Sequence, residues 1–365
     1  MDLSKHASLQ RVVAIARPAV DSRGAAFDDP PGRAVCAAAG PPPALERAML
    51  VGIINPAAGH KPAVDLAHVL ATSSPRLRLV MSDRPDDLEG LLSAIDAGAQ
   101  LIVIAGGDGT TCNLLTRFDR AGILDRLPPL LVLPAGRVNT IASALVGSRK
   151  PAVLAQRILH AWTRGVRRIK PVPVVRVRLD GMPDHVGFTA SIGAVARIHA
   201  DYRHAMVQGA IGIAEILARL ALFRLPAERY RPITGPFELE PGPLRLEEIT
   251  FGMLSPLPSF FHFVRPFPNV LTVAQGDGVH MVLANLGALA TQAVMPGLLR
   301  GLLGPHPLVQ YGTTSRLAWT NGGKGDLVVL DGEELAVAPG ARVQIDVAAH
   351  VKMVVWKDLP AKDPA

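Results

Sequence analysis

The feature that most constrains the fold is a series of short apolar runs, each followed by a polar turn. Between the runs lie segments with helical periodicity, of which Asp86–Ala97 is the clearest and a segment starting at about Thr111 is another. Apolar runs that alternate with helices are typical of buried parallel strands. The sequence therefore predicts an α/β fold with an open parallel sheet covered by helices on both faces. The expected strands are Met49–Ile54, Leu77–Met81, Leu101–Ala105 and Leu130–Leu133.

Three polar turns follow strands of this predicted sheet. They are Asn55–Lys61, Gly106–Thr110 and Pro134–Thr140. In open α/β sheets, ligands bind beyond the carboxyl ends of the strands. These turns are therefore the first candidates for a binding site.

The turn Gly106-Gly107-Asp108-Gly109-Thr110 carries the most chemical information. Its glycines permit positive φ and leave no Cβ between the backbone and a phosphate. A helix that begins at the turn directs free N–H groups at an anion, and Thr110 is expected to cap it. A carboxylate in such a place suggests that Asp108 holds Mg²⁺ or accepts a proton. The alternative is a purely structural strand-to-helix turn with an aspartate cap, because a glycine-rich turn alone is weak evidence.

Beyond residue 165 the pattern changes to short, alternating strands separated by proline and glycine. This pattern predicts a second, antiparallel β-sandwich-like domain. We expect a flexible leader over residues 1–48, a nucleotide-binding α/β domain over 49–165, a β-rich substrate domain over 166–358 and a tail over 359–365; Met49 is an alternative start. The strands expected in the second domain are Pro173–Leu179, Val186–Ala190, Leu244–Met253 and Val279–Leu283.

Charge and composition restrict the partners. A formal net charge of +7 suits an anionic partner such as a nucleotide or an acidic membrane, although a solvated basic surface is an equal alternative. Aromatic residues make up only 4% of the chain, which disfavours nucleic acid. Cys36 and Cys112 have no metal or redox spacing, so a cytoplasmic location is expected. The oligomeric state stays open, with a homodimer as one arrangement.

Two apolar stretches, Ile211–Leu225 and Met281–Leu299, need an explanation. The second has no charged residue and is long enough for a transmembrane helix. Its proline, glycines and amide side chains favour a helix that is buried in the core or lies at the membrane interface beside Arg300.

Four ordered motifs resemble the diacylglycerol kinase catalytic domain, a family that includes sphingosine and ceramide kinases and is more distantly similar to NAD kinases. This resemblance implies an ATP-dependent, Mg²⁺-requiring lipid kinase of phospholipid metabolism, with a lipid hydroxyl as acceptor and peripheral contact with a membrane. The motifs are Asn55-Pro56-Ala57-Ala58-Gly59, the Gly106–Thr110 turn, Pro134-Ala135-Gly136-Arg137-Val138-Asn139 and Asp331-Gly332-Glu333.

The resemblance also implies roles for individual residues. Asp108, Asp331 and Glu333 are the expected catalytic residues, and Asp108 is the expected metal ligand. From the sequence alone, a type I′ hairpin turn is the favoured interpretation of Asp331-Gly332, and only the resemblance favours a functional role. Lys61 is as typical of a surface lysine. The expected nucleotide-binding residues are Asn55, Pro56, Gly59, Lys61, Gly106, Gly107, Gly109, Thr110, Gly136, Arg137 and Asn139.

The chain departs from the family pattern at several positions. Cys112-Asn113 replaces Asn-Glu, Arg137 replaces a threonine, Ala190 replaces an asparagine, and Pro256–Phe263 replaces a glycine-rich loop. These departures motivate one alternative, a non-catalytic nucleotide- or lipid-binding protein of the same fold. A further alternative is a kinase for a soluble acceptor, of the NAD kinase type. We do not find the second-domain glycine motif of that family in this sequence.

Overall fold

The computed structural model describes residues 50–55, 66, 69–70, 72, 77–81, 87–136, 138–147, 150–203, 226–260, 264–268, 270–302 and 304–356. Pro56, Gly59, Lys61 and Arg137 lie outside the described residues, as does the apolar stretch Ile211–Leu225.

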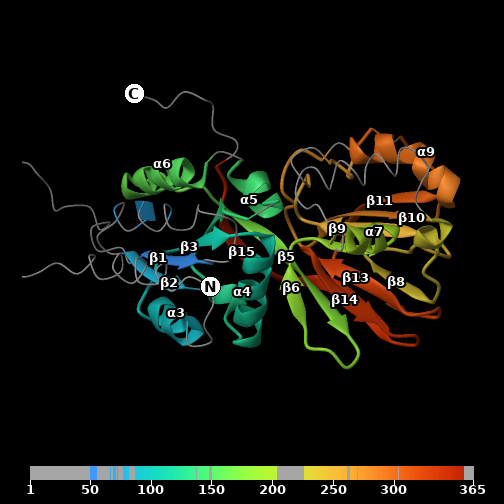
Figure 1. The fold of residues 1–365 in the computed structure, drawn as a ribbon, viewed down its shortest axis with the longest axis horizontal. Coiled ribbons are helices and arrows are strands. Elements are labelled where there is room, and N and C mark those ends of the chain that lie inside the picture. The colour runs from blue at the N-terminus through green and yellow to red at the C-terminus, as the bar shows by residue number, and fades with distance from the viewer. Residues whose placement is uncertain are drawn as a thin grey trace, which may run out of the picture.

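The amino-terminal half contains the predicted parallel sheet. Its strands run in the order β2-β1-β3-β4, and almost every described side chain in β1, β3 and β4 is buried, as expected for strands covered on both faces. Figure 1 shows α5 and α6 on one side of these strands and α3 and α4 on the other. The elements are β1 (Leu50–Ile54), β2 (Leu77–Met81), α3 (Asp87–Asp96), β3 (Leu101–Gly106), α4 (Asp108–Arg120), the 3₁₀ turn Leu124–Arg126, β4 (Leu130–Pro134), α5 (Thr140–Leu145) and α6 (Pro151–Thr163).

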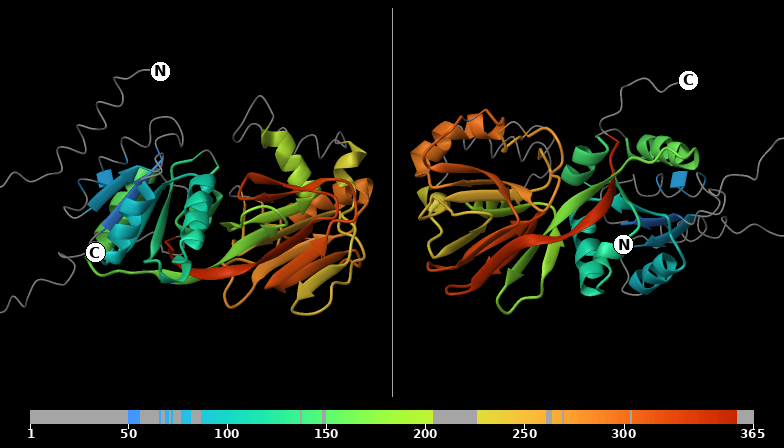
Figure 2. Two further views of the ribbon diagram at one scale, coloured as in Figure 1. Left: turned by 90° about the horizontal axis from the view of Figure 1, so that it is seen from below. Right: turned by 180° about the vertical axis from the view of Figure 1, so that it is seen from behind.

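Two long strands connect the halves of the molecule. β5 (Ile169–Leu179) and β15 (Arg342–Val354) pair along their whole length, with a register shift between Val347 and Ala349. One end of β15 pairs with β4, and the other end pairs with β12 (Arg316–Thr320). Figure 2 shows this green and red strand pair running between the halves. Both strands contribute side chains to the cores of the two halves, so the domain limits given above stay a prediction.

The carboxyl-terminal half is a sandwich of antiparallel strands, which confirms the predicted fold class. Within the described residues, one layer is the far part of the long sheet, where β12 pairs with β8 (Phe237–Glu240). The other layer has the order β11-β10-β9-β7-β13-β14, and apolar side chains from both layers share one core. Its strands are β7 (Ala190–Gly193), β9 (Phe251–Ser255), β10 (Val279–Ala284), β11 (Val309–Thr314), β13 (Asp326–Leu330) and β14 (Glu333–Val337); α7 (Ala194–Arg203), the 3₁₀ turn Ala227–Tyr230 and α9 (Ala288–Leu299) complete this half.

Two predicted strands need correction. Val186–Ala190 is not one strand, because β6 (His185–Gly187) pairs with β5, whereas β7 lies in the opposite layer. The chain changes layers at Phe188 and Thr189, whose N–H groups bond to a side chain instead of a strand. The strand predicted from Leu244 begins only at Phe251; before it, Ile249 forms a single antiparallel bridge with Ile233 instead of joining the strand.

The stretch Met281–Leu299 is also not one helix. Its first residues complete β10, and α9 begins at Ala288. Among the described residues, no helix is long and apolar enough to cross a membrane.

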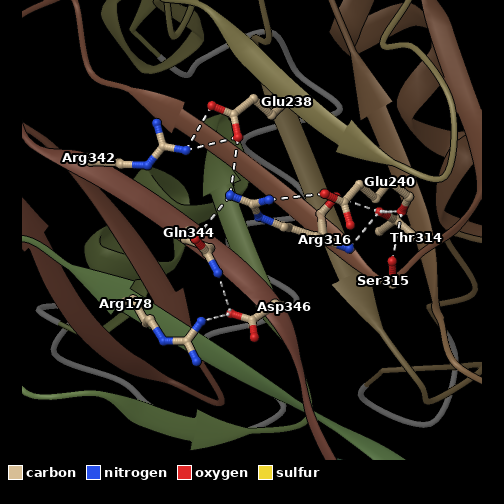
Figure 3. A network of polar contacts seen from close by, with 9 residues as sticks. All are labelled: Arg178, Glu238, Glu240, Thr314, Ser315, Arg316, Arg342, Gln344 and Asp346. Atoms are coloured by element: carbon tan, nitrogen blue, oxygen red, sulfur yellow. Dashed lines mark hydrogen bonds and ion pairs between the residues drawn. The ribbon is translucent and has the colours of Figure 1, made fainter.

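A ladder of charged side chains covers the outer face of β5, β15, β12 and β8 (Figure 3). Arg316 bonds to Glu240 at 3.0 Å and to Glu238 at 3.2 Å, and Arg342 bonds to Glu238 at 2.7 Å. Glu240 lies opposite Arg316 and Glu238 diagonal to it on the neighbouring antiparallel strand, where opposite charges attract, whereas Arg342 on β15 reaches Glu238 across β12. The ladder therefore stabilises the pairing of the outer strands in the carboxyl-terminal half of the molecule.

Candidate active site

Turns at the carboxyl edge of the parallel sheet are bound to one another. The Asn55 N–H donates to the carbonyl of Ala105 at 3.0 Å, and the Asn55 side-chain amide donates to Thr110 Oγ1 at 2.8 Å. The Ala135 N–H donates to the carbonyl of Gly106 at 3.2 Å. The turns after β1, β3 and β4 therefore form one surface, as the sequence predicts.

The glycines of this edge serve close packing rather than positive φ. Gly106, Gly107 and Gly109 do not adopt positive φ, which corrects the expectation above. A Cβ at Gly136 would lie 2.4 Å from Gly107 Cα, and a Cβ at Gly106 would lie 2.6 Å from Thr110 Cβ. Two turns can approach this closely only without side chains. Gly109 differs, because a Cβ there would meet nothing within 4 Å, so its side of the turn is open.

Helix α4 begins earlier than predicted, at Asp108, with Gly107 as its N-cap and no side-chain cap. Thr110 is therefore not the cap, and its hydroxyl instead accepts the bond from Asn55. The first N–H groups of an α-helix have no partner within the helix. An uncapped first turn beside the open Gly109 fits an anionic ligand such as phosphate.

Asp108 connects this turn to the next one. Its two carboxylate oxygens accept the N–H groups of Thr140 and Ile141, at 2.9 Å each, so Asp108 caps α5 rather than its own helix. Asn139, which has φ of 57°, turns its side chain back on its own loop. Its Oδ1 accepts the Gly136 N–H at 2.6 Å and its amide donates to the Gly136 carbonyl at 2.7 Å. The roles of Asn139 and Gly136 toward a nucleotide stay predictions.

Asp331 and Gly332 form the two-residue turn between β13 and β14. Both have positive φ, of 47° and 91°, and Leu330 pairs with Glu333 across them. This geometry is that of a type I′ hairpin, so the hairpin interpretation was right. The Asp331 carboxylate accepts the N–H groups of Phe188 at 2.6 Å and Thr189 at 2.9 Å, in the segment that joins β6 to β7.

Burial determines the chemistry of this carboxyl group. Burial raises the pKa of Asp331 to about 8, with further contributions from the negative charges of Asp108 and Glu333, against the lowering effect of the Phe188 and Thr189 N–H groups. Asp108, from the parallel half, is thus close enough to act electrostatically on Asp331, from the sandwich. The structure brings the two predicted acidic motifs together.

Neighbouring residues that the motifs did not identify shape this junction. A Cβ at Gly187 would lie 2.4 Å from Asp331 Oδ2, so the carboxylate needs a glycine there. Thr116 of α4 bonds through its hydroxyl to both the N–H and the carbonyl of Val186, at 2.9 and 3.2 Å. A glycine within a strand often marks a place where another group approaches the backbone closely, so Gly187 was the one signal of this junction in the sequence. The backbone N–H groups of Phe188 and Thr189 leave no signal in the sequence.

Cys112, one of the departures from the family pattern, lies within the same junction. It is fully buried, and its thiol donates to the carbonyl of Val186 at 3.1 Å. Burial raises its pKa well above the usual value, and the charges of Asp331 and Glu333 raise it further. A thiol with a raised pKa is a poor nucleophile, so Cys112 fills space and fixes α4 against β6.

Glu333 is the first residue of β14, and its carboxylate lies 3.9 Å from the His185 ring nitrogen on β6. Within the described residues, no group of three or more His, Cys, Asp or Glu side chains could by itself hold a metal ion. Mg²⁺ is usually held by one or two carboxylates together with phosphate oxygens. Asp108, a carboxylate at the carboxyl edge of the parallel sheet beside the first turn of α4, fits the first of these requirements.

The comparison with known sequences agrees with the motifs. Residues 49–170 match the diacylglycerol kinase catalytic domain. A diacylglycerol kinase of Mycobacterium tuberculosis (strain CDC 1551 / Oshkosh) is 28% identical over 123 residues, which cover 32% of this chain and 38% of that protein. The diacylglycerol kinase of strain ATCC 25618 / H37Rv matches to the same extent. The match thus spans well under half the length of these relatives.

Solved structures agree with the fold over a larger part of the chain. A crystal structure of a protein assigned as a diacylglycerol kinase from Bacillus anthracis str. Sterne has a TM-score of 0.62 at 17% identity, covering 84% of this chain and 96% of that one. A crystal structure of a diacylglycerol kinase from the same organism has a TM-score of 0.56 at 16% identity. At such identities the likeness shows the fold alone. Together with the sequence match, it confirms the resemblance stated above: residues 49–170 match the diacylglycerol kinase catalytic domain, and the likeness in fold extends over most of the chain.

Proposed function

We propose that this protein is an ATP-dependent lipid kinase, which transfers the γ-phosphoryl group to the hydroxyl of a lipid such as diacylglycerol or a sphingoid base. The observation that carries this proposal is the meeting of two carboxylates from different halves. Asp108 follows a parallel strand at the carboxyl edge of its sheet, and its negative charge acts on Asp331 of the sandwich, where it helps to raise the pKa of that carboxyl group. Sites at such junctions are common places for substrate binding.

The nucleotide phosphates would lie at the start of α4. The uncapped first turn offers backbone N–H groups and the positive end of the helix dipole. The open side of Gly109 leaves room for phosphate oxygens. Asp108 would supply one carboxylate ligand to Mg²⁺, which, when bound, neutralises charge on the phosphates.

Asp331 would accept the proton of the acceptor hydroxyl. The hydroxyl oxygen forms a bond to the γ-phosphorus while the bond from that phosphorus to the β–γ bridging oxygen breaks, and ADP leaves. The proton passes to the Asp331 carboxylate and then to water. A pKa of about 8 suits this role, because a base titrating near working pH combines a usable ionised fraction with a real proton affinity.

A second candidate is a binding protein without turnover. This candidate is favoured because groups that are expected to contact the ligand make hydrogen bonds to other parts of the protein instead. The Asp108 carboxylate accepts two N–H groups of α5, and the Asn139 amide bonds within its own turn. In addition, Leu257, from the segment that replaces the glycine-rich loop, is fully buried in the core of the parallel half.

The test is to incubate the purified protein with γ-labelled ATP, magnesium and a total lipid extract, beside a sample with excess chelator. We expect magnesium-dependent label in the organic phase. Nucleotide binding with no labelled product would support the second candidate, and label on a water-soluble nucleotide would support a kinase of the NAD type. Either result would overturn the proposed lipid kinase activity.

A further inference from the structure

Helix α9 is an inverted surface helix. Its only polar side chains, Thr291 and Gln292, are buried: Thr291 donates to the Leu286 carbonyl at 2.9 Å, and Gln292 donates to the Tyr230 hydroxyl at 3.4 Å. A surface helix of a globular protein normally places apolar residues inward and charges outward. Among the α9 residues whose side chains the structure describes, Ala288 and Val294 pack against the core, and the exposed ones are Leu289, Ala290, Ala293 and Pro296, all apolar.

Exposed leucines extend this surface at both ends of the helix. Leu289 is 74% exposed, Leu302 is 74% exposed and Leu271 is 76% exposed. Elsewhere in the described residues, the large apolar side chains that reach solvent are no more than 46% exposed. Leu289 lies in the first turn of α9, Leu302 follows the helix, and Leu271 lies in the loop before β10; we call these leucines together with the exposed residues of α9 the α9 surface. Apolar residues gathered in this way on a surface mark an interaction site.

Acidic residues are scarce in the part of the sequence that carries the α9 surface. Between Glu248 and Asp326 the chain has a single acidic residue, Asp277, which precedes β10 and lines a groove beside Arg316 and His350. Arg300 follows α9 directly and is exposed, as is Arg265. A surface that combines apolar side chains with basic residues complements an anionic bilayer, because its leucines enter the acyl boundary while its arginines meet lipid phosphates.

The basic end of the α9 surface also lies toward the candidate site. A Cβ at Gly301 would lie 2.9 Å from the Arg265 carbonyl, so the end of α9 packs on the loop that carries Arg265. Arg265 and Leu271 line a cavity of about 110 Å³ with Lys170 and with Ala144 of α5, the helix that Asp108 caps. Figure 1 shows α5 and α9 on the same side of the molecule.

We propose that the α9 surface is where this protein docks on an anionic lipid bilayer, with Leu271, Leu289 and Leu302 inserted and Arg265 and Arg300 on the phosphates. The proposal rests on the proposed lipid kinase function, for which it supplies the source of the acceptor. The protein contacts the bilayer from one side and does not span it.

The test is co-sedimentation with vesicles of phosphatidylcholine, with or without phosphatidylglycerol. We expect the wild-type protein to bind the phosphatidylglycerol vesicles and the double variant L289Q/L302Q to bind them at least about tenfold more weakly, because two leucines no longer leave water. Val166→Gln, a substitution of an apolar residue that is 46% exposed outside the α9 surface, is the matched control and should bind like wild type. Arg265→Gln and Arg300→Gln should each weaken binding roughly fivefold, and less at high salt.

Several outcomes decide between explanations. Equal binding by wild type and L289Q/L302Q would overturn the proposal, as would failure of wild type to bind. If light scattering shows a wild-type dimer that the double variant dissociates, with vesicle binding unchanged, a second copy covers the surface and the proposal is wrong. An unchanged melting temperature in L289Q/L302Q excludes unfolding as the cause of a loss.

Activity separates this proposal from the proposed function. L289Q/L302Q should phosphorylate a short-chain diacylglycerol dissolved as monomers as fast as wild type, but should lose activity on diacylglycerol embedded in vesicles. If the wild-type protein phosphorylates neither form and still binds anionic vesicles through these leucines, the kinase function fails and the docking surface stands.

Discussion

Asp108 and Asp331 are held in the same way but in different surroundings. Each carboxylate accepts two backbone N–H groups from consecutive residues of another element: Thr140 and Ile141 for Asp108, and Phe188 and Thr189 for Asp331. Asp108 lies on the open, anion-binding side of a helix terminus, whereas burial raises the pKa of Asp331 to about 8. The proposed roles, a metal ligand and a base, would thus fall to two carboxylates that share their pattern of hydrogen bonds but differ in their surroundings.

The comparison predicts the largest effect for Asp108→Asn. The substitution removes the charge that would hold Mg²⁺ against the phosphates, so transfer should fall below detection, by roughly 10³-fold or more. Because asparagine keeps only one of the two acceptors for α5, unfolding should become easier by about 0.5–2 kcal/mol. Transfer assays and denaturant titrations check both effects. Wild-type turnover in a folded variant would remove Asp108 from the mechanism.

Asp331→Asn should lower kcat by about 10²–10⁴-fold, the usual contribution of a general base, while nucleotide affinity stays near that of wild type. Stability supplies an independent reading. The native carboxyl keeps its proton up to pH about 8, whereas an unfolded aspartate loses it near pH 4, so Asp331 makes the fold less stable as pH rises across that window. The variant should lose this part of the pH dependence of unfolding. If the two proteins show the same pH dependence, Asp331 does not titrate as we describe.

Gly187→Ala should displace the Asp331 carboxylate from its hydrogen-bond partners while leaving its charge in place. The new Cβ would lie 2.4 Å from Asp331 Oδ2, so the carboxyl group must move off the Phe188 and Thr189 N–H groups. We expect a loss of about 1–3 kcal/mol in unfolding free energy and a reduced kcat. Gly312→Ala is the matched control, since a Cβ at this strand glycine meets nothing within 4 Å. Equal behaviour of the two alanine variants would show that the close approach at Gly187 does not hold Asp331 in place.

Much of the fold could be predicted from sequence, because buried parallel strands and helices leave strong periodic patterns. β1, β2, β3 and β4 lie within a residue of their predicted limits at either end. The layer change at Phe188 left no pattern, because it depends on a carboxylate more than a hundred residues away. The inverted α9 was equally hidden, because its composition alone does not distinguish a buried helix from an exposed one.

The candidate site was predictable in part. The motifs singled out both acidic groups, and in the structure the charge of Asp108 acts on Asp331, while the catalytic roles of both stay predictions. Motifs did not predict that Asp108 caps α5 or that Thr110 bonds to Asn55, since these contacts depend on how separate turns pack. Nor could they identify Gly187, whose need for a missing Cβ arises only once Asp331 is in place.

Arg316→Ala should have the smallest effect of these substitutions. Arg316 lies in the charged ladder on the outer strands, away from both carboxylates, and its side chain is 30% exposed. Surface ion pairs contribute little, so we expect a loss of about 1 kcal/mol or less at low salt, even less at high salt, and unchanged kcat. A large fall in kcat would show that the outer sheet, not only the junction, controls the site.

The most direct test of the central claim, that Asp331 is a buried base under the influence of neighbouring acids, is the pH dependence of kcat in wild type and Glu333→Gln. The account predicts that wild-type kcat rises with pH toward a plateau above about 8, as Asp331 loses its proton. Removing the Glu333 charge should move this rise to lower pH, because one of the causes that raise the pKa of Asp331 is gone. A rise at the same pH in both proteins, or no rise near neutral pH in wild type, would contradict the account.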